Sequence, residues 1–214
     1  RVIMLGGAEE CSPAQYRKMI AQLAQKLTAM NIAQAAVHLL GTKVKGHNIA
    51  WKAQALMQAL SHASYRFNNY KSKPKQPVSV KRVRLLASQS DQKALRAAIK
   101  LGAALDEGLT LAKDLGNEPS NVCTPTYLLN QARKMARSKE VTLTALDEKK
   151  MLSLGMGAFM SVSQGSDQPG KMIILRYNGG KKDEAPIALV GKGITFDTGG
   201  ISLKPPPGMD EMKF

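Results

Sequence analysis

The sequence predicts an α/β protein made of two domains that a long helix connects. Short apolar runs of strand character alternate with longer segments in which apolar residues recur at helical spacing, as is typical of sheets covered by helices. Positive charge is concentrated in the first 90 residues, which indicates two parts with different surfaces. A long helical pattern begins where this charge density falls, so we expect the connection between the domains there.

The first 90 residues predict a parallel α/β layer. The expected strands are residues 2–5, 33–41 and 80–88, and the expected helices are residues 13–30 and 49–67. Ser12 is a suitable N-cap for the first helix, because Pro13 then takes the first helical position, where its missing N–H costs nothing. Strands that alternate with helices in this way favour parallel pairing.

A second α/β domain is expected to begin after the connecting helix. Ser90 is a suitable cap for this helix, and Gly116 and Asn117 end its pattern after about Leu115. We therefore assign residues 1–90 to the first domain, 91–115 to the helix and 116–214 to the second domain. Thr124 caps a further helix with Pro125 at its first position. The strands expected in the second domain are residues 141–146, 158–165, 172–177 and 186–193.

The composition indicates a soluble cytosolic protein. No apolar stretch approaches the roughly 20 residues of a membrane span, and the first residues do not resemble a signal peptide. Cys11 and Cys123 share no metal-ligand or CxxC spacing, which favours reduced thiols in a reducing compartment. Because the chain starts at Arg1 directly in a strand pattern, we expect it to be a piece of a longer protein.

The basic charge of the first half has two interpretations. Residues 1–90 contain 14 Lys and Arg against 2 Asp and Glu, a balance of +12 out of the total of +15. The run from Tyr70 to Arg84 contains no acid. It predicts either a solvated loop that leads into an edge strand or a surface that contacts nucleic acid phosphates. Its cations are Lys71, Lys73, Lys75, Lys81, Arg82 and Arg84.

The glycine-rich segments do not fit either common phosphate-binding motif. A P-loop needs a glycine five residues before the Gly191-Lys192 pair, where Pro186 stands, and Ser or Thr where Gly193 stands. A dinucleotide fingerprint would need a small residue where Met160 or Phe196 stands. The sequence therefore excludes both nucleotide motifs at these segments.

Three charged residues lie at or beyond the carboxyl end of the last expected strand, where sites in α/β proteins usually lie. Lys192, Asp197 and Lys204 are separated by small residues that allow other groups to come close to the carboxylate. A lysine can ligate a metal only as the neutral amine. From spacing alone, the three residues are compatible with a metal site and with a salt-bridged turn.

The segments "VGKGITFDTGGISLKP" and "GMDEMK" resemble the metal-site region of the leucyl aminopeptidases, the cytosol aminopeptidase family. Further segments with the same resemblance are "AKDLGNEPSNVCTP", "GMGAFMSVSQGS" and "LRYNG", so the resemblance covers roughly residues 105–214. It implies a macro-like N-terminal α/β domain and a catalytic domain with a mixed central sheet. It also implies a metallo-exopeptidase that acts on peptides with a free N-terminus.

The resemblance implies a role for each of the three residues. Lys192 matches a lysine ligand of one metal, Asp197 a carboxylate that contacts two metals, and Lys204 the catalytic lysine that polarises the peptide carbonyl. The family uses two divalent ions, Mn, Zn or Mg, to activate water, which agrees with the general chemistry of two-metal hydrolysis. Asp210 and Glu211 match positions that are not ligands.

The resemblance also implies features that this chain does not contain. In the family an aspartate ligand follows Phe214, and a later Asp-x-Glu-x-Arg segment supplies two more ligands and an arginine that holds bicarbonate. The family forms homo-hexamers in the cytoplasm. We therefore expect the 214-residue chain to be inactive alone. The alternative function is a nucleic-acid-binding module that uses the basic N-terminal half, with or without peptidase activity.

Overall fold

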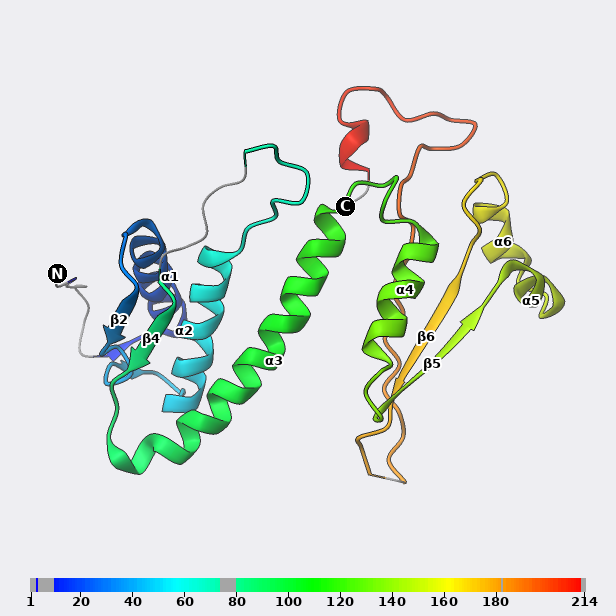
Figure 1. The fold of residues 1–214 in the computed structure, drawn as a ribbon. Helices are drawn as coiled ribbons and strands as arrows, with labels where there is room; N and C mark the ends of the chain where they lie inside the picture. The colour runs from blue at the N-terminus through cyan, green and yellow to red at the C-terminus, as the bar shows by residue number, and fades with distance from the viewer. Residues whose placement is uncertain (1–2, 4–9, 74–79, 182, 213–214) are drawn as a thin grey trace. The chain divides into compact units, whose positions relative to one another are not determined.

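The computed structural model of the chain describes residue 3 and residues 10–73, 80–181 and 183–212. The chain divides into two compact units, residues 1–114 and residues 115–214, which Figure 1 shows as ribbons. Both units combine helices with short paired strands, so the predicted α/β class is confirmed. Among the described residues, no helix is both long and apolar enough to cross a membrane.

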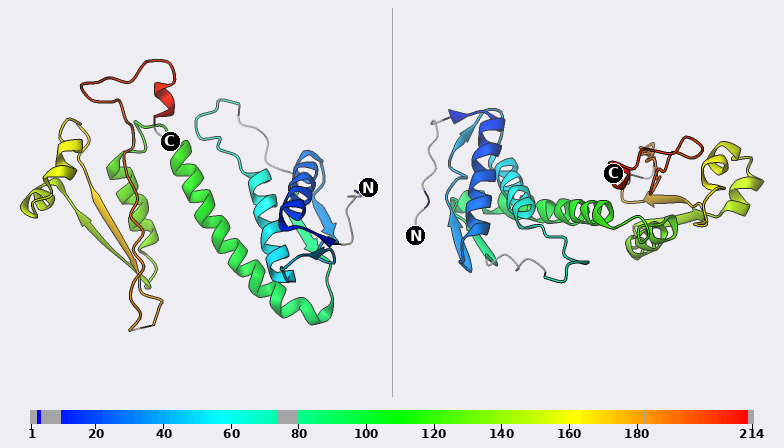
Figure 2. Two further views of the ribbon diagram at one scale, coloured as in Figure 1. Left: turned by 180° about the vertical axis from the view of Figure 1, so that it is seen from behind. Right: turned by 90° about the horizontal axis from the view of Figure 1, so that it is seen from above.

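The first unit contains two pairs of parallel strands. β1 (Glu10–Cys11) pairs with β3 (Lys43–Val44), and β2 (Gln34–Val37) pairs with β4 (Arg82–Leu85). The helices α1 (Pro13–Ala29) and α2 (Ile49–Ser64) pack together on one face of the β2–β4 pair (Figure 2). The predicted parallel layer is confirmed. The expected strand at residues 2–5 falls, apart from Ile3, outside the described residues.

Helix α1 begins where its sequence predicts and buries one face. Ser12 and Gln15 form a capping box, in which the Gln15 N–H donates to Ser12 Oγ (3.3 Å) and the Ser12 N–H donates to Gln15 Oε1 (2.8 Å). The buried residues of α1 recur every three or four positions and are Tyr16, Ile20, Leu23, Ala24 and Leu27. They form the core of the first unit with side chains of α2 and of the strands.

A buried lysine closes the loop that follows β2, which the sequence pattern did not indicate. Lys52 Nζ, on α2, donates to the carbonyl oxygens of Leu40 and Thr42, the latter at 2.9 Å. Burial lowers the pKa of Lys52, while Asp91 and Cys11 act in the opposite direction. The two carbonyl contacts satisfy an ammonium group that would otherwise be costly to bury.

Tyr16 gives the first unit a measurable pH dependence. Burial, assisted by Cys11, raises the pKa of Tyr16 from 10.0 to about 12. Between these two values the unfolded chain loses this proton and the folded chain keeps it, so the stability of the fold decreases as pH rises through that window. We expect absorbance at 295 nm to show one phenol that ionises near pH 12 in the folded protein and near pH 10 in denaturant. Tyr16→Phe should remove this late step, and an unchanged titration curve would contradict the assignment.

The long helix α3 (Gln92–Asn117) packs against α2 in the first unit. Its buried face contains Leu95, Ala98 and Gly102. A β-carbon on Gly102 would lie 2.9 Å from the sulfur of Met57, so the Met57 side chain would have to shift. Tyr65, at the C-cap of α2, donates its OH to Asp114 Oδ1 (2.7 Å). A long helix here was predicted, but its expected cap was wrong. Ser90 lies inside a 3₁₀ helix (Gln89–Asp91) that precedes α3, with Ser88 at the N-cap position.

The second unit is built on an antiparallel strand pair. β5 (Val141–Leu146) pairs along its whole length with β6 (Met172–Tyr177), and both strands were predicted. The helix α4 (Pro125–Met135) packs on them and begins as expected, because the Tyr127 N–H donates to Thr124 Oγ1 (3.3 Å). The remaining elements are α5 (Glu148–Ser153), α6 (Gly157–Ser163) and a 3₁₀ helix (Met209–Glu211).

The strand expected at residues 158–165 is wrong, because this segment forms helix α6. Gly155 adopts a left-handed φ of 72° just after α5, and the chain then turns directly into the next helix. The N–H of Met160 donates to Met156 O (3.1 Å). Only Met160 of this helix is buried, so the other apolar side chains face solvent.

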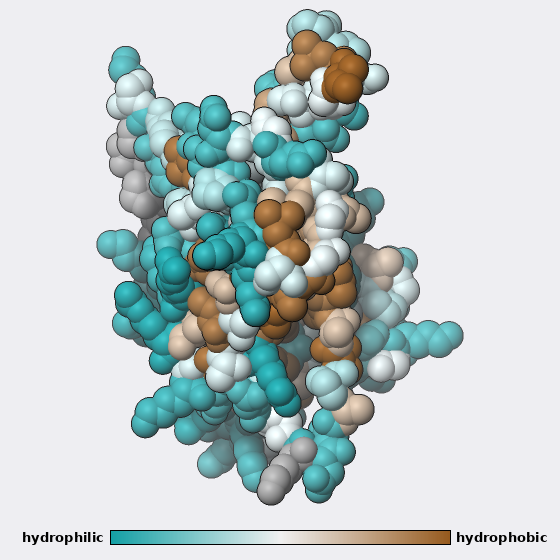
Figure 3. Space-filling model, turned by 90° about the vertical axis from the view of Figure 1, so that its right-hand side faces the viewer, coloured by the Kyte–Doolittle hydropathy of each residue, from teal (hydrophilic) through white to brown (hydrophobic). Residues whose placement is uncertain are grey.

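The strand expected at residues 186–193 is also wrong in this structure. Residues 186–193 are irregular, and the side chains of Ile187, Leu189 and Val190 are at least 90% exposed. A continuous apolar run is typical of a strand that is covered on both faces, and within the described part of the chain nothing covers this one. The second unit also exposes other large apolar side chains. Figure 3 shows apolar residues on its surface in brown.

Candidate active site

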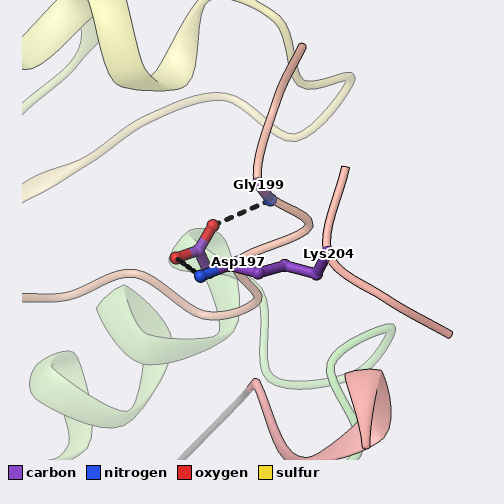
Figure 4. Close-up of polar contacts among 3 residues, drawn as sticks. All are labelled: Asp197, Gly199 and Lys204. Atoms are coloured by element: carbon purple, nitrogen blue, oxygen red, sulfur yellow. Dashed lines mark hydrogen bonds and ion pairs between the residues drawn. The ribbon is translucent and has the colours of Figure 1, made fainter. Parts of the chain in front are cut away.

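A turn between Asp197 and Lys204 brings together two of the three residues that the sequence singled out (Figure 4). Lys204 Nζ lies 3.8 Å from Asp197 Oδ2, and the Gly199 N–H donates to Asp197 Oδ1 at 2.9 Å. The Lys204 N–H donates to the Thr198 carbonyl oxygen at 2.9 Å, which closes the turn. Each carboxylate oxygen of Asp197 therefore has its own partner.

The turn depends on left-handed backbone at two neighbouring glycines. Gly199 has φ of 89° and Gly200 has φ of 67°, and residues with a β-carbon rarely adopt such values. The Gly-Gly pair in the sequence thus allows the chain to reverse within a few residues. This reversal places the Lys204 side chain next to the carboxylate.

A backbone contact fixes the position of Asp197 from a second direction. The Asp197 N–H donates to the carbonyl oxygen of Met212 (3.2 Å), just after the last 3₁₀ helix. A carbonyl oxygen is present in every residue, so this contact could not be predicted from residue types. Asp210 and Glu211 lie on that helix with exposed side chains.

The ion pair between Asp197 and Lys204 is open to solvent. Their side chains are 41% and 38% exposed, respectively. An ion pair this exposed contributes only about 0–1 kcal/mol to stability. Asp197 can therefore separate from Lys204 with little loss of stability. A carboxylate that is to bind a metal ion needs this freedom.

The structure does not bring Lys192 into the turn. Lys192 lies in the irregular segment before Asp197, with an exposed side chain. Within the residues that the structure describes, it forms no hydrogen bond or ion pair with Asp197 or Lys204. Its expected role as a ligand stays a prediction.

The donors of this segment fit part of a metal site. Asp197 presents an accessible carboxylate, which is a suitable ligand for divalent ions. In the described ranges, however, there is no group of three or more His, Cys, Asp or Glu side chains that could hold a metal ion. Asp197 and Lys192 could supply two donors to a site whose other ligands come from elsewhere.

The basic residues predicted to contact nucleic acid lie on the surface of the first unit wherever the structure describes them. Lys71, Lys73 and Lys81 are exposed, and Lys75 lies outside the described residues. Along β4, the side chains of Arg82 and Arg84 are exposed, while those of Val83 and Leu85 pack against the core. The two arginines therefore lie on the face of the β2–β4 pair opposite α1 and α2.

Two sequence models of one family match the chain. The catalytic domain of the cytosol aminopeptidase family matches residues 110–214, and the N-terminal domain of the same family matches residues 1–74. The first match contains the whole Asp197–Lys204 turn. The second contains the basic segment up to Lys73 but not β4.

The chain is similar throughout its length to bacterial proteins of this family. It is 48% identical to a probable cytosol aminopeptidase of Pseudomonas aeruginosa (strain UCBPP-PA14) and 44% identical to one of Stutzerimonas stutzeri (strain A1501). Both alignments cover 100% of this chain and 44% of the relative. The chain thus spans less than half the length of these curated relatives.

Solved structures of a related enzyme have the same fold. The bottromycin maturation enzyme BotP in complex with Mn superimposes with a TM-score of 0.75 at 27% identity, and a second BotP structure with a TM-score of 0.70 at 26% identity. Each covers 94% of this chain and 40% of BotP. Because both domain models of one family match in the expected order, the chain belongs to the cytosol aminopeptidase family.

Proposed function

We propose that the full-length protein is a metal-dependent aminopeptidase that releases N-terminal residues from peptides. The observation that carries this proposal is the closed turn in which Lys204 lies 3.8 Å from Asp197. This turn lies within the segment that matches the family's catalytic domain. It places a carboxylate suited to metal binding beside a cation suited to polarising a carbonyl group.

Asp197 and Lys192 are proposed as ligands of two divalent ions. The remaining ligands would come from the part of the protein that the longer relatives contain in addition. Such ions supply Lewis-acid activation of water and of the peptide carbonyl. The BotP complex with Mn supports manganese as one candidate, and the family resemblance adds zinc and magnesium. A bicarbonate ion bound by a later arginine belongs to the same proposal.

Lys204 is proposed to act directly on the substrate. Its ammonium group can donate a hydrogen bond to the carbonyl oxygen of the peptide bond as negative charge develops there. Contact with Asp197 holds the ammonium group next to the carboxylate that would bind metal. The Lys204 ammonium group would then lie next to the peptide carbonyl group of a substrate bound at the metal site.

The proposed substrates are peptides with an unblocked α-amino group. The free amine would bind at the metal site, which would restrict cleavage to the first residue. We further propose a homo-hexamer in the cytoplasm. The names of the relatives, which are cytosol aminopeptidases, support the location, and the family resemblance supports the assembly.

The test of the proposed function compares a free with a blocked N-terminus. The full-length enzyme, loaded with Mn²⁺, should hydrolyse leucine p-nitroanilide and should not hydrolyse its N-acetyl derivative. Equal hydrolysis of the two substrates would contradict an aminopeptidase. Cleavage within a peptide blocked at its N-terminus would identify an endopeptidase instead.

As a second candidate function, we propose weak binding of DNA by the basic surface of the first unit. The alternation along β4 supports it, because Arg82 and Arg84 leave the core on the same side of the sheet. Their strand partners on that side are Gln34 and Ala36, so this face of the pair carries no acidic side chain. Such an arrangement suits a phosphate backbone and reads no base sequence.

Binding of this kind should depend steeply on salt. Each phosphate contact is expected to add about −0.9 to the slope of log K against log salt concentration. Replacing Lys71, Lys73 and Lys75 together with alanine should flatten this slope by up to the share of three contacts and leave peptidase activity unchanged. The measurement is fluorescence anisotropy with a labelled duplex between low and moderate salt.

A matched triple variant controls for the loss of charge alone. Lys134, Lys139 and Lys149 are exposed lysines of the second unit, and their replacement with alanine removes the same net charge. The slope should change much less in this control. If the wild type and the Lys71, Lys73 and Lys75 variant had equal slopes, these lysines would not contact DNA. The basic run would then be a solvated loop.

A further inference from the structure

One glycine of the active-site turn lies where no side chain can fit. A β-carbon built on Gly199 would overlap the carbonyl oxygen of Ser202 and would lie 2.9 Å from the backbone nitrogen of Lys204. It would also lie 3.2 Å from Lys204 Cγ. Two of the three atoms it meets belong to Lys204 itself, and the third belongs to the backbone two residues before it.

The neighbouring glycine provides an internal comparison. Gly200 has nearly the same left-handed backbone, with φ of 67° against 89° for Gly199. A β-carbon on Gly200 would meet nothing within 4 Å. Both positions favour glycine for conformational reasons, but only Gly199 is also required by the space beside Lys204.

Gly199 contacts the other partner of the ion pair as well. Its N–H donates to Asp197 Oδ1 (2.9 Å), while Lys204 Nζ faces Asp197 Oδ2. The same residue thus orients the carboxylate through its N–H and allows the lysine to approach through its missing side chain. A residue with a β-carbon would keep the N–H, but its side chain would force Lys204 or the backbone before it to move.

From this geometry we propose that Gly199 is a positioning residue, which sets the place of the Lys204 ammonium group relative to Asp197. The proposal rests on the function proposed above, in which Lys204 donates to the peptide carbonyl. Gly199 itself touches no substrate and acts through Lys204. A displacement of about 1 Å at a reacting group can cost on the order of a hundredfold in rate.

The test is a double-mutant cycle on the full-length, metal-loaded enzyme. Gly199→Ala should lower kcat by about ten- to a hundredfold, with KM changed less than about threefold, because the loss occurs at the reacting carbonyl. In the Lys204→Ala background, Gly199→Ala should cost less than about threefold more, since the group it positions is already absent. Gly200→Ala should stay within about threefold of the wild type.

Several outcomes would overturn the proposal. Equal losses for Gly199→Ala and Gly200→Ala would mean that only the left-handed backbone matters. A full, additive loss in the Lys204→Ala background would show that Gly199 does not act through Lys204. An unchanged kcat for Gly199→Ala would show that the turn tolerates the side chain.

A second variant covers the case in which Gly199→Ala does not fold. Inserting one glycine after Gly200 lengthens the exposed turn without adding a side chain, and it should give the same Lys204-dependent loss of kcat. An insertion variant with wild-type kcat would also overturn the proposal. Failure of the proposed function would look different, because the wild-type enzyme would then show no metal-dependent peptidase activity at all.

Discussion

Replacing Asp197 with alanine is expected to remove bound divalent metal from the full-length enzyme and to abolish peptide hydrolysis. Asp197 is the carboxylate of the closed turn, with one oxygen facing Lys204 and the other accepting from the Gly199 N–H. Metal activation accounts for several kcal/mol of catalysis, and each 1.36 kcal/mol is a factor of ten. We therefore expect a loss of at least about a thousandfold in kcat/KM.

The control for this variant is Asp210→Ala, which removes the same charge from an exposed position of the neighbouring 3₁₀ helix. Metal content, measured by mass spectrometry of the metals after gel filtration, should fall in Asp197→Ala and stay at the wild-type level in the control. If Asp197→Ala kept its full metal content and activity, this aspartate would not be a ligand.

Replacing Lys204 with alanine is expected to separate turnover from metal binding. Loss of a single oxyanion donor lowers kcat by about a hundred- to a thousandfold in well-studied hydrolases. Metal content should remain, because the lysine is not a ligand in this account. Metal affinity should even rise slightly, since the variant removes a cation 3.8 Å from the carboxylate and an exposed pair contributes about 0–1 kcal/mol.

Isothermal titration with Mn²⁺ and steady-state kinetics on the same preparation measure both effects of Lys204→Ala. Lys181→Ala is a suitable control, because Lys181 is exposed and lies outside the turn. The roles would be reversed if Lys204→Ala lost its metal while Asp197→Ala kept it. That result would require a new assignment of both residues.

Elements with a distinct chemical start signal were predicted from the sequence. Ser12 before Pro13 and Thr124 before Pro125 each place a side-chain acceptor where a helix needs one, and both helices begin there. The strands β5 and β6 were also predicted, because β-branched and other apolar residues predominate in both. These signals are local, so the rest of the fold is not needed to interpret them.

Elements that depend on distant partners were predicted less well. The apolar run at residues 186–193 has the composition of a covered strand, but a strand forms only where hydrogen-bonding partners lie beside it. The short pattern of residues 158–165 fits a strand and a helix equally well. In the structure a helix begins directly after the turn at Gly155. The burial of Lys52 could not be predicted, because it depends on two backbone carbonyls of another segment.

The candidate site shows the same division between local and distant information. Asp197 and Lys204 were selected as residue types in a characteristic order, and the turn places them side by side. The reason for the glycine at position 199 lies in torsion angles and in the atoms that surround it, which a pattern of letters does not contain. Lys192 carries no such local constraint, and in the structure it lies apart from the pair.

The most direct test of the central claim is the metal dependence of the full-length enzyme. Exhaustive dialysis against EDTA should reduce the hydrolysis of leucine p-nitroanilide to background, and addition of Mn²⁺ or Zn²⁺ to the metal-free protein should restore it. The restored rate should saturate with bound metal, measured in the same samples. Hydrolysis that persists after the metal content has fallen to zero would contradict the account.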